Sequence, residues 1–159
     1  MRDLLEARSG VCHPTVYETK GMVEDKPPRG SHAPGTFWYY TRDFERFALL
    51  YLHGGKWNDA QVVPEDWVRV STHPYSDAHS GGYGYLWWTA DSASGTPQEI
   101  SFPAGSFWAE GHLGQYAVVV PSRDLIIVNR VDEELTKRQV SKRQMARFAQ
   151  MVLAVALPN

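Results

Sequence analysis

Beyond Gly84 the chain is dominated by short runs of aromatic and β-branched residues, and this pattern constrains the fold more than any other feature of the sequence. The runs cover residues 85–89, 106–112, 116–120 and 125–131. Such residues suit a half-buried pleated surface, so each run predicts a β-strand. The last two runs are separated by Pro121-Ser122-Arg123-Asp124, which has the length of a hairpin turn. The sequence therefore predicts an antiparallel sheet.

Two helices are predicted before these strands. Apolar residues recur at helical spacing from Thr41 to His53, and Gly54-Gly55 supplies a C-terminal stop. The next helix is predicted to begin at Pro64, because proline is tolerated at the first helical position.

A third helix is predicted near the end of the chain. Ser141 and Gln144 have the spacing of a capping box. The apolar face of this helix is predicted to pack on the sheet; it comprises Met145, Phe148, Ala149, Val152, Leu153 and Ala156. The fold class expected from these elements is α+β, an antiparallel sheet flanked by helices.

Composition narrows the class of protein. With 159 residues and 43% hydrophobic residues, the chain is long enough to form one domain with a core and too apolar to be disordered. A net charge of −2 argues against nucleic acid as a partner, since phosphate binding requires an excess of Lys and Arg. The lone Cys12 excludes an intramolecular disulfide framework. The most apolar stretch, residues 145–157, is shorter than a membrane span requires and contains Arg147, so no span is predicted.

Common catalytic motifs are missing from the sequence. The six histidines include no pair at i,i+4 and no HExxH, so they are interpreted as loop and surface residues and no metal site is predicted. There is no GxSxG, which argues against an ordinary α/β-hydrolase. No serine is followed three residues later by lysine, so SxxK is absent as well.

The order of the segments carries more information than any one of them. A helix ending in Gly54-Gly55 is followed by Gly-Tyr-Leu-Trp-Trp at 84–88, Glu-Gly-His-Leu-Gly-Gln-Tyr at 110–116, and Pro-Ser-Arg-Asp before Leu-Ile-Ile-Val. Over nearly the whole chain this succession resembles the β-lactamase-related serine hydrolases, which include class C β-lactamases, DD-peptidase-like proteins, esterases and the 6-aminohexanoate-dimer hydrolases. The resemblance implies a central antiparallel sheet between helical layers. It also implies acyl transfer from an ester, amide or β-lactam-like substrate through a serine ester, without a cofactor.

The resemblance also implies roles for individual residues. His112-Leu113-Gly114 looks like the family's KTG or HxG motif, which lies on an edge strand beside the nucleophile. Gly114 would let substrate approach the strand closely, the Gln115 N–H would be an oxyanion donor, and His112 would orient the substrate or join the proton network. Taken alone, a histidine between two glycines also fits a bend or bulge with an exposed ring.

The second family motif, Tyr-x-Asn, is altered in this chain. The resemblance places the catalytic tyrosine at Tyr39, with Thr41 in the position of the asparagine. An aromatic core strand or loop is the alternative interpretation of residues 38–40.

The chain is therefore interpreted as one partial β-lactamase-like domain over residues 1–159. We expect an internal junction near residues 40/41, where two segments that are separated in the family abut. We also expect the N-terminal region that carries SxxK to be missing, and therefore expect the chain as it stands to be inactive. The alternative function is a non-catalytic ligand-binding or interaction module, in which exposed sheet or core surface would favour self-association or binding to a complementary chain.

Two further groups of residues have two interpretations each. The aromatic group Trp87, Trp88, Phe107 and Trp108 either lines an acyl pocket or belongs to the core, which is the commoner role. A basic cluster near the last helix follows Asp132-Glu133-Glu134 and is interpreted as a solvated face with local charge compensation; it comprises Lys137, Arg138, Lys142, Arg143 and Arg147.

Overall fold

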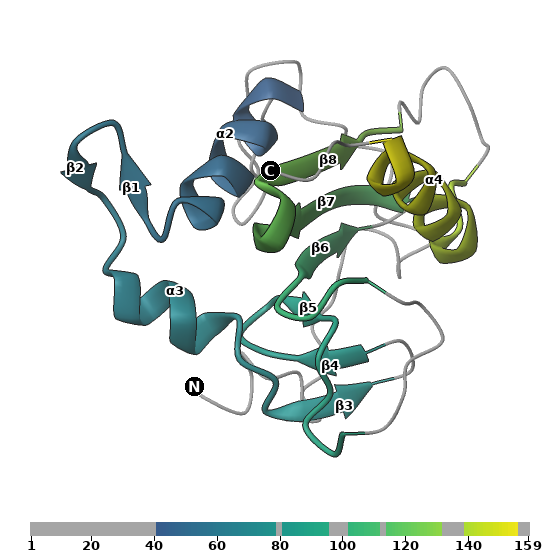
Figure 1. Cartoon of the computed structure of the whole chain (residues 1–159), viewed down its shortest axis with the longest axis horizontal. Helices are drawn as coiled ribbons and strands as arrows, with labels where there is room; N and C mark the ends of the chain where they lie inside the picture. Colours follow the sequence, from purple (N-terminus) through teal and green to yellow (C-terminus); the bar gives the residue numbers. More distant parts are fainter. Residues whose placement is uncertain (1–40, 79–80, 96–101, 112–113, 132–138, 156–159) are drawn as a thin grey trace, which may run out of the picture.

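The computed structural model describes residues 41–78, 81–95, 102–111, 114–131 and 139–155 (Figure 1). These residues form a mixed α+β structure with a six-stranded antiparallel sheet and three α-helices. The sheet strands are β3 (Ser76–Ala78), β4 (Gly81–Tyr83), β5 (Trp88–Thr89), β6 (Phe107–Gly111), β7 (Gln115–Val120) and β8 (Leu125–Asn129). The helices are α2 (Thr41–Leu52), α3 (Glu65–Ser71) and α4 (Lys142–Val155), and a small hairpin joins β1 (Lys56–Trp57) to β2 (Ala60–Gln61).

The strands of the main sheet lie side by side in chain order, from β3 at one edge to β8 at the other. Every neighbouring pair is antiparallel, as the sequence predicts. The 3-10 turn Pro121–Arg123 connects β7 to β8 and ends at Asp124, which has a left-handed backbone conformation. The predicted hairpin is therefore confirmed.

Alternation along the strands divides the core into two layers. Ala117 and Val119 of β7 point to the side covered by α2 and α3, whereas Tyr116, Val118 and Val120 point to the side covered by α4. Because neighbouring residues of a strand face opposite sides of the sheet, β7 is buried on both faces. Figure 1 shows α2 and α4 on opposite sides of the sheet.

The aromatic group of residues 87–108 belongs to this core. Trp87 and Phe107 lie in the layer under α2, while Trp108 and the half-buried Trp88 lie in the layer under α4. Their rings pack on one another, with centroids 5.1 Å apart for Trp87 and Phe107 and 6.5 Å apart for Trp88 and Trp108. The core interpretation therefore holds for these residues.

The end of α2 follows from its two glycines. The N–H of Gly55 donates to the carbonyl of Leu50 (2.8 Å), and the N–H of Gly54 donates to that of Tyr51 (3.1 Å). These are the two bonds of a Schellman motif, which requires a left-handed residue after the helix. Gly54 meets that requirement with φ of 60°.

Two local expectations around α3 and β5 are wrong. Pro64 lies at the N-cap position, one residue before the helix, so its extended backbone precedes α3 instead of opening it. The strand expected over 85–89 is reduced to Trp88–Thr89, because Leu86 adopts a positive φ of 66° and turns the chain. The N–H of Tyr85 donates instead to the carbonyl of Ser71 (2.8 Å), which attaches this turn to the end of α3.

The capping box of α4 is confirmed. The backbone N–H of Ser141 donates to Gln144 Oε1 (2.9 Å), and the backbone N–H of Gln144 donates to Ser141 Oγ (3.3 Å). The predicted apolar face is rotated slightly, since Ala146 is buried and Phe148 is 52% exposed. Ala156 lies outside the described residues.

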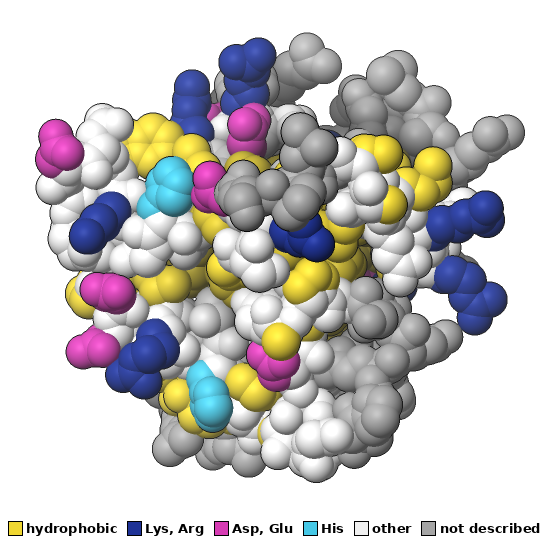
Figure 2. Space-filling view, in the orientation of Figure 1, with side chains coloured by type: hydrophobic (Ala, Val, Ile, Leu, Met, Phe, Trp, Pro, Cys, Tyr) yellow, Lys and Arg dark blue, Asp and Glu magenta, His cyan; other side chains and the backbone are white. Residues whose placement is uncertain are grey.

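The face shown in Figure 2 carries charges of both signs. Lys and Arg side chains are interspersed with Asp and Glu, and hydrophobic atoms lie between them. This distribution agrees with the net charge of −2. In the described parts of the chain, the helices are too short or too polar to cross a lipid bilayer.

Candidate functional site

The predicted site residues that the structure describes lie where β6 passes into β7. Gly111 at the end of β6 pairs with Gln115 at the start of β7, and Gly114 directly precedes Gln115. The resemblance places this motif on an edge strand, but β6 and β7 are both interior strands of the described sheet. Tyr39 precedes Thr41, where the described residues begin, so Tyr39 and the expected junction near 40/41 are not described. His112 also lies outside the described residues, between Gly111 and Gly114.

Gly114 allows a close approach, but the approaching group is part of the same chain. Its φ is 88°, and a Cβ at this position would overlap the carbonyl oxygen of Val140. The carbonyl of Gly114 accepts a hydrogen bond from Asn129 Nδ2 (2.7 Å). The main chain that leads into α4 therefore occupies the space that a Cβ at position 114 would need.

The side chain of Gln115 joins the start of β7 to the end of β8. Its Nε2 donates to the carbonyl of Val131 (2.8 Å), and its Oε1 accepts from the N–H of Val131 (3.0 Å). The amide thus reproduces, two residues past the end of β8, the two bonds that a paired strand residue would make. The side chain of Gln115 has a structural role in this arrangement.

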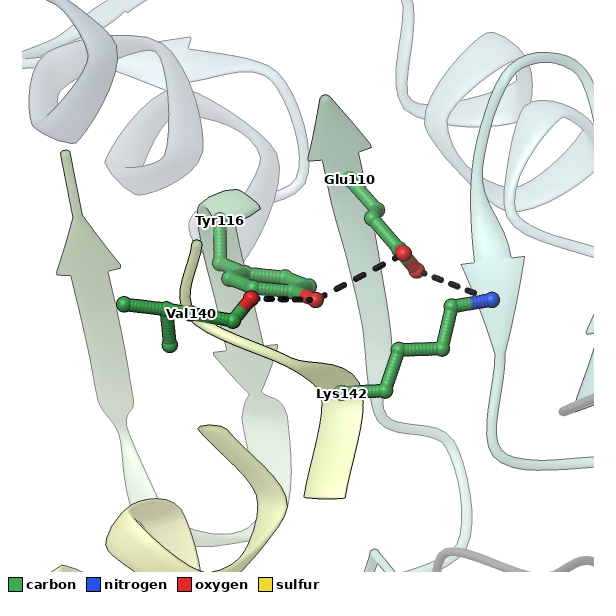
Figure 3. Close-up of polar contacts among 4 residues, drawn as sticks. All are labelled: Glu110, Tyr116, Val140 and Lys142. Atoms are coloured by element: carbon green, nitrogen blue, oxygen red, sulfur yellow. Dashed lines mark hydrogen bonds and ion pairs between the residues drawn. The ribbon is translucent and has the colours of Figure 1, made fainter. Parts of the chain in front are cut away.

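A polar cluster lies next to these residues on the α4 side of the sheet (Figure 3). The Tyr116 hydroxyl lies 3.5 Å from Glu110 Oε1 and 3.4 Å from the carbonyl oxygen of Val140. Its single proton can serve one acceptor at a time, and both distances are long for an O–H···O bond. Burial, the negative charge of Glu110 and the hydrogen bond to it raise the pKa of Tyr116 to about 12. Tyr116 is therefore a neutral phenol at physiological pH and is no general base.

Lys142 connects this cluster to the first turn of α4. Its Nζ lies 3.2 Å from Glu110 Oε2 and 4.3 Å from the centre of the Trp88 ring. A cation at a helix N-terminus is unfavourable to the helix dipole, and the Glu110 carboxylate offsets that charge. Lys142 was expected on a solvated face, so the structure corrects this part of the basic cluster.

The cluster has little room for a ligand. A pocket of about 10 Å³ lies beside it, bordered by Trp108, Tyr116 and Met145 among others. This volume suits about one water molecule. The cluster therefore acts as a clamp that joins β6, β7 and the start of α4.

Sequence reasoning did not find this clamp. Glu110 and Tyr116 lie in the segment that was identified, but Lys142 follows 26 positions later in a run that looks like a charged helix surface. The one local signal is Ser141 with Gln144, which places Lys142 in the first turn of α4. Nothing in the sequence indicates which strand this turn contacts.

No described base is paired with Ser71, Ser106 or Ser141. Ser106 is 1% exposed, and its Oγ has no hydrogen-bond partner within the described segments. Ser71 Oγ donates to the carbonyl of Val68 (3.1 Å), and Ser141 Oγ belongs to the capping box. Among the residues with defined positions, no three His, Cys, Asp or Glu side chains are grouped closely enough to hold a metal ion.

Comparison with known proteins gives no assignment. No protein-family model matches the chain, and the search of curated proteins finds no matching relative.

Proposed function

We propose that this chain is a partial β-lactamase-related module that does not carry out acyl transfer by itself and works as a non-catalytic interaction module. The observation that carries the proposal is the contact between Gly114 and Val140. In the related hydrolases the equivalent glycine faces substrate, as the resemblance implies. In this chain the backbone at Val140 lies against Gly114, and this contact supports the proposal.

The order of segments supports the relationship to these hydrolases. The helix that ends in Gly54-Gly55 precedes the segment with His112-Leu113-Gly114, and a hairpin of two apolar strands and a C-terminal helix follow. An antiparallel sheet with helices on both faces is compatible with the family architecture. The assignment of this sheet to the β-lactamase fold remains part of the proposal.

The absence of catalytic parts favours interaction over catalysis. SxxK does not occur in the sequence, and an oxyanion donor has nothing to stabilise without a nucleophile. The pocket of about 10 Å³ beside Tyr116 leaves no room for a small-molecule ligand at this cluster, because ligand pockets are usually about 300 Å³ or larger. We therefore favour a polypeptide partner over a small one.

Covalent labelling tests the catalytic part of this proposal. The purified chain is incubated separately with a fluorophosphonate probe, a p-nitrophenyl ester and a chromogenic β-lactam, and its intact mass is measured. We expect an unchanged mass and no release of chromophore above the buffer rate. A family member with an intact SxxK serves as the positive control.

Stoichiometric addition of one probe would show that the chain has a reactive nucleophile and would overturn the proposal. Ser106→Ala then serves as the matched variant, because Ser106 is the buried hydroxyl without a described partner. Loss of labelling in this variant would identify Ser106 as the nucleophile. Retained labelling would point to a different residue.

A further inference from the structure

The helix α4 carries apolar residues on two sides. Met145 and Ala149 are buried in the layer between α4 and the sheet. Phe148, Met151 and Val155 belong to the other side and are 52%, 63% and 79% exposed. Single exposed apolar residues are common on protein surfaces, but a group of them marks a surface that another molecule covers.

The three exposed residues form one stripe along the helix, which we call the outer stripe. Phe148, Met151 and Val155 follow one another at intervals of three and four residues, so they lie on the same face of α4. Anchors at i, i+3 and i+7 are those with which a helix packs against an apolar partner. The alternation of three and four is also that of the contact positions in paired helices. The outer stripe is therefore suited to contact with another helix.

The charges of α4 all have the same sign. The helix contains Lys142, Arg143 and Arg147 and neither Asp nor Glu. Arg147 is exposed and forms no ion pair with another described residue. It lies four residues before Met151, so it borders the outer stripe. In paired helices the charges beside the apolar seam select the partner, and a carboxylate at this point complements Arg147.

Two other occupants fit the outer stripe less well. A second copy of α4 would bring the same positive charges and no carboxylate, so the two helices would repel each other. A membrane surface attracts clusters of about four to eight Lys and Arg. The helix α4 has three basic residues, and the carboxylate of Glu110 already offsets the charge of Lys142.

We propose that the outer stripe of α4 binds an amphipathic helix of another protein, whose apolar face is bordered by Asp or Glu. This inference rests on the interaction role proposed above and names the class of partner. The outer stripe spans about two helical turns, so the interface is small. We therefore expect a dissociation constant of about 10–100 μM.

Two synthetic peptides test the proposal on the full chain. Each peptide has three heptads with Ile at the a positions and Leu at the d positions; one carries Glu at every e and g position, and the other carries Lys there. The fluorescence anisotropy of each labelled peptide is measured while the chain is titrated in. We expect the acidic peptide to bind about tenfold more tightly than the basic one.

Three variants locate the binding on α4. Phe148→Ala removes the aromatic anchor and should weaken binding of the acidic peptide about tenfold. Gln150→Ala is the matched control, because Gln150 is exposed on α4 outside the outer stripe, and it should change the affinity by less than about twofold. Arg147→Glu should let the basic peptide bind more tightly than it binds the wild type. Misfolding cannot produce such a gain.

Failure of the acidic peptide to bind, or equal affinity for the two peptides, would overturn the proposal. Self-association in sedimentation velocity, or binding to vesicles of phosphatidylserine and phosphatidylcholine, would also overturn it if Phe148→Ala abolished that binding. The outer stripe would then belong to a second copy or to a membrane. Probe labelling is a separate measurement, so a chain that takes up neither probe nor peptide refutes this inference and leaves the non-catalytic proposal standing. A labelled chain that binds the acidic peptide does the reverse.

Discussion

Gly114 has no side chain, and this allows the main chain at Val140 to pack directly against it. We predict that Gly114→Ala lowers the free energy of unfolding by about 2–4 kcal/mol, since alanine must adopt a left-handed conformation and displace the carbonyl of Val140. Urea unfolding measures this loss. The matched control is Gly105→Ala, which has a similar φ of 76° but nothing within 4 Å of an added Cβ. Equal losses at the two sites would show that the contact with Val140 is unimportant.

Tyr116 gives the molecule a predictable response to alkali. Its pKa is about 12 in the folded chain and near the ordinary value of 10.0 in the unfolded chain. The unfolded state therefore releases the proton first as the pH rises, and the stability that the neutral phenol contributes is complete below about pH 10 and is lost between about pH 10 and 12. We expect Tyr116→Phe to flatten this part of the curve of unfolding free energy against pH. Parallel curves for the variant and the wild type would contradict the assigned pKa.

At the scale of elements, the capping box decides how firmly α4 begins beside the clamp. Ser141→Ala removes the acceptor for the Gln144 N–H, so we predict a loss of about 1 kcal/mol in the free energy of unfolding. Thermal unfolding followed by circular dichroism measures this change. Ser122→Ala, in the exposed turn before β8, is the control and should change stability by less than about 0.5 kcal/mol. If the two variants lose equal stability, the cap bonds do not hold the helix.

The elements that could be predicted are those whose signals are local. The helix over 41–53, the hairpin around Pro121-Ser122-Arg123-Asp124 and the capping box each depend on residues within a few positions of one another. The pairs β1–β2 and β3–β4 were missed because their strands have two or three residues, too few to show alternation. Phe148 was misplaced because helical spacing defines a broad stripe, and contact with the sheet selects Ala146 at its other side.

The site was less predictable than these elements because its contacts are not local in the sequence. The sequence identified Gly114 and Gln115 as special positions, and both have unusual roles in the structure. It did not reveal that Val140 and Val131 are their partners, because these contacts join segments 16 to 26 residues apart. Long-range contacts of this kind depend on how α4 returns to the sheet, which no local pattern encodes.

At the scale of the whole molecule, stability should decrease from the middle of the sheet towards β3. The strand β7 is buried on both faces and pairs on both sides, whereas β3 is a three-residue edge. Backbone amides exchange with solvent through local opening, which is rarest where the most structure must be disrupted. We expect the amides of Ala117 to Val119 to exchange most slowly and those of β3 to exchange fastest among the strands of the main sheet.

The strand β8 should depart from this gradient, because among the described residues only its inner side is paired with another strand. In an antiparallel ladder alternate amides point to opposite neighbours, so one set in β8 faces β7 and the other faces the outer edge. We expect the outward set to exchange faster than the inward set, because only the inward set is bonded to β7. Exchange measured residue by residue by NMR separates the two sets. Equally slow exchange of both sets would show that the outer edge of β8 is covered as well.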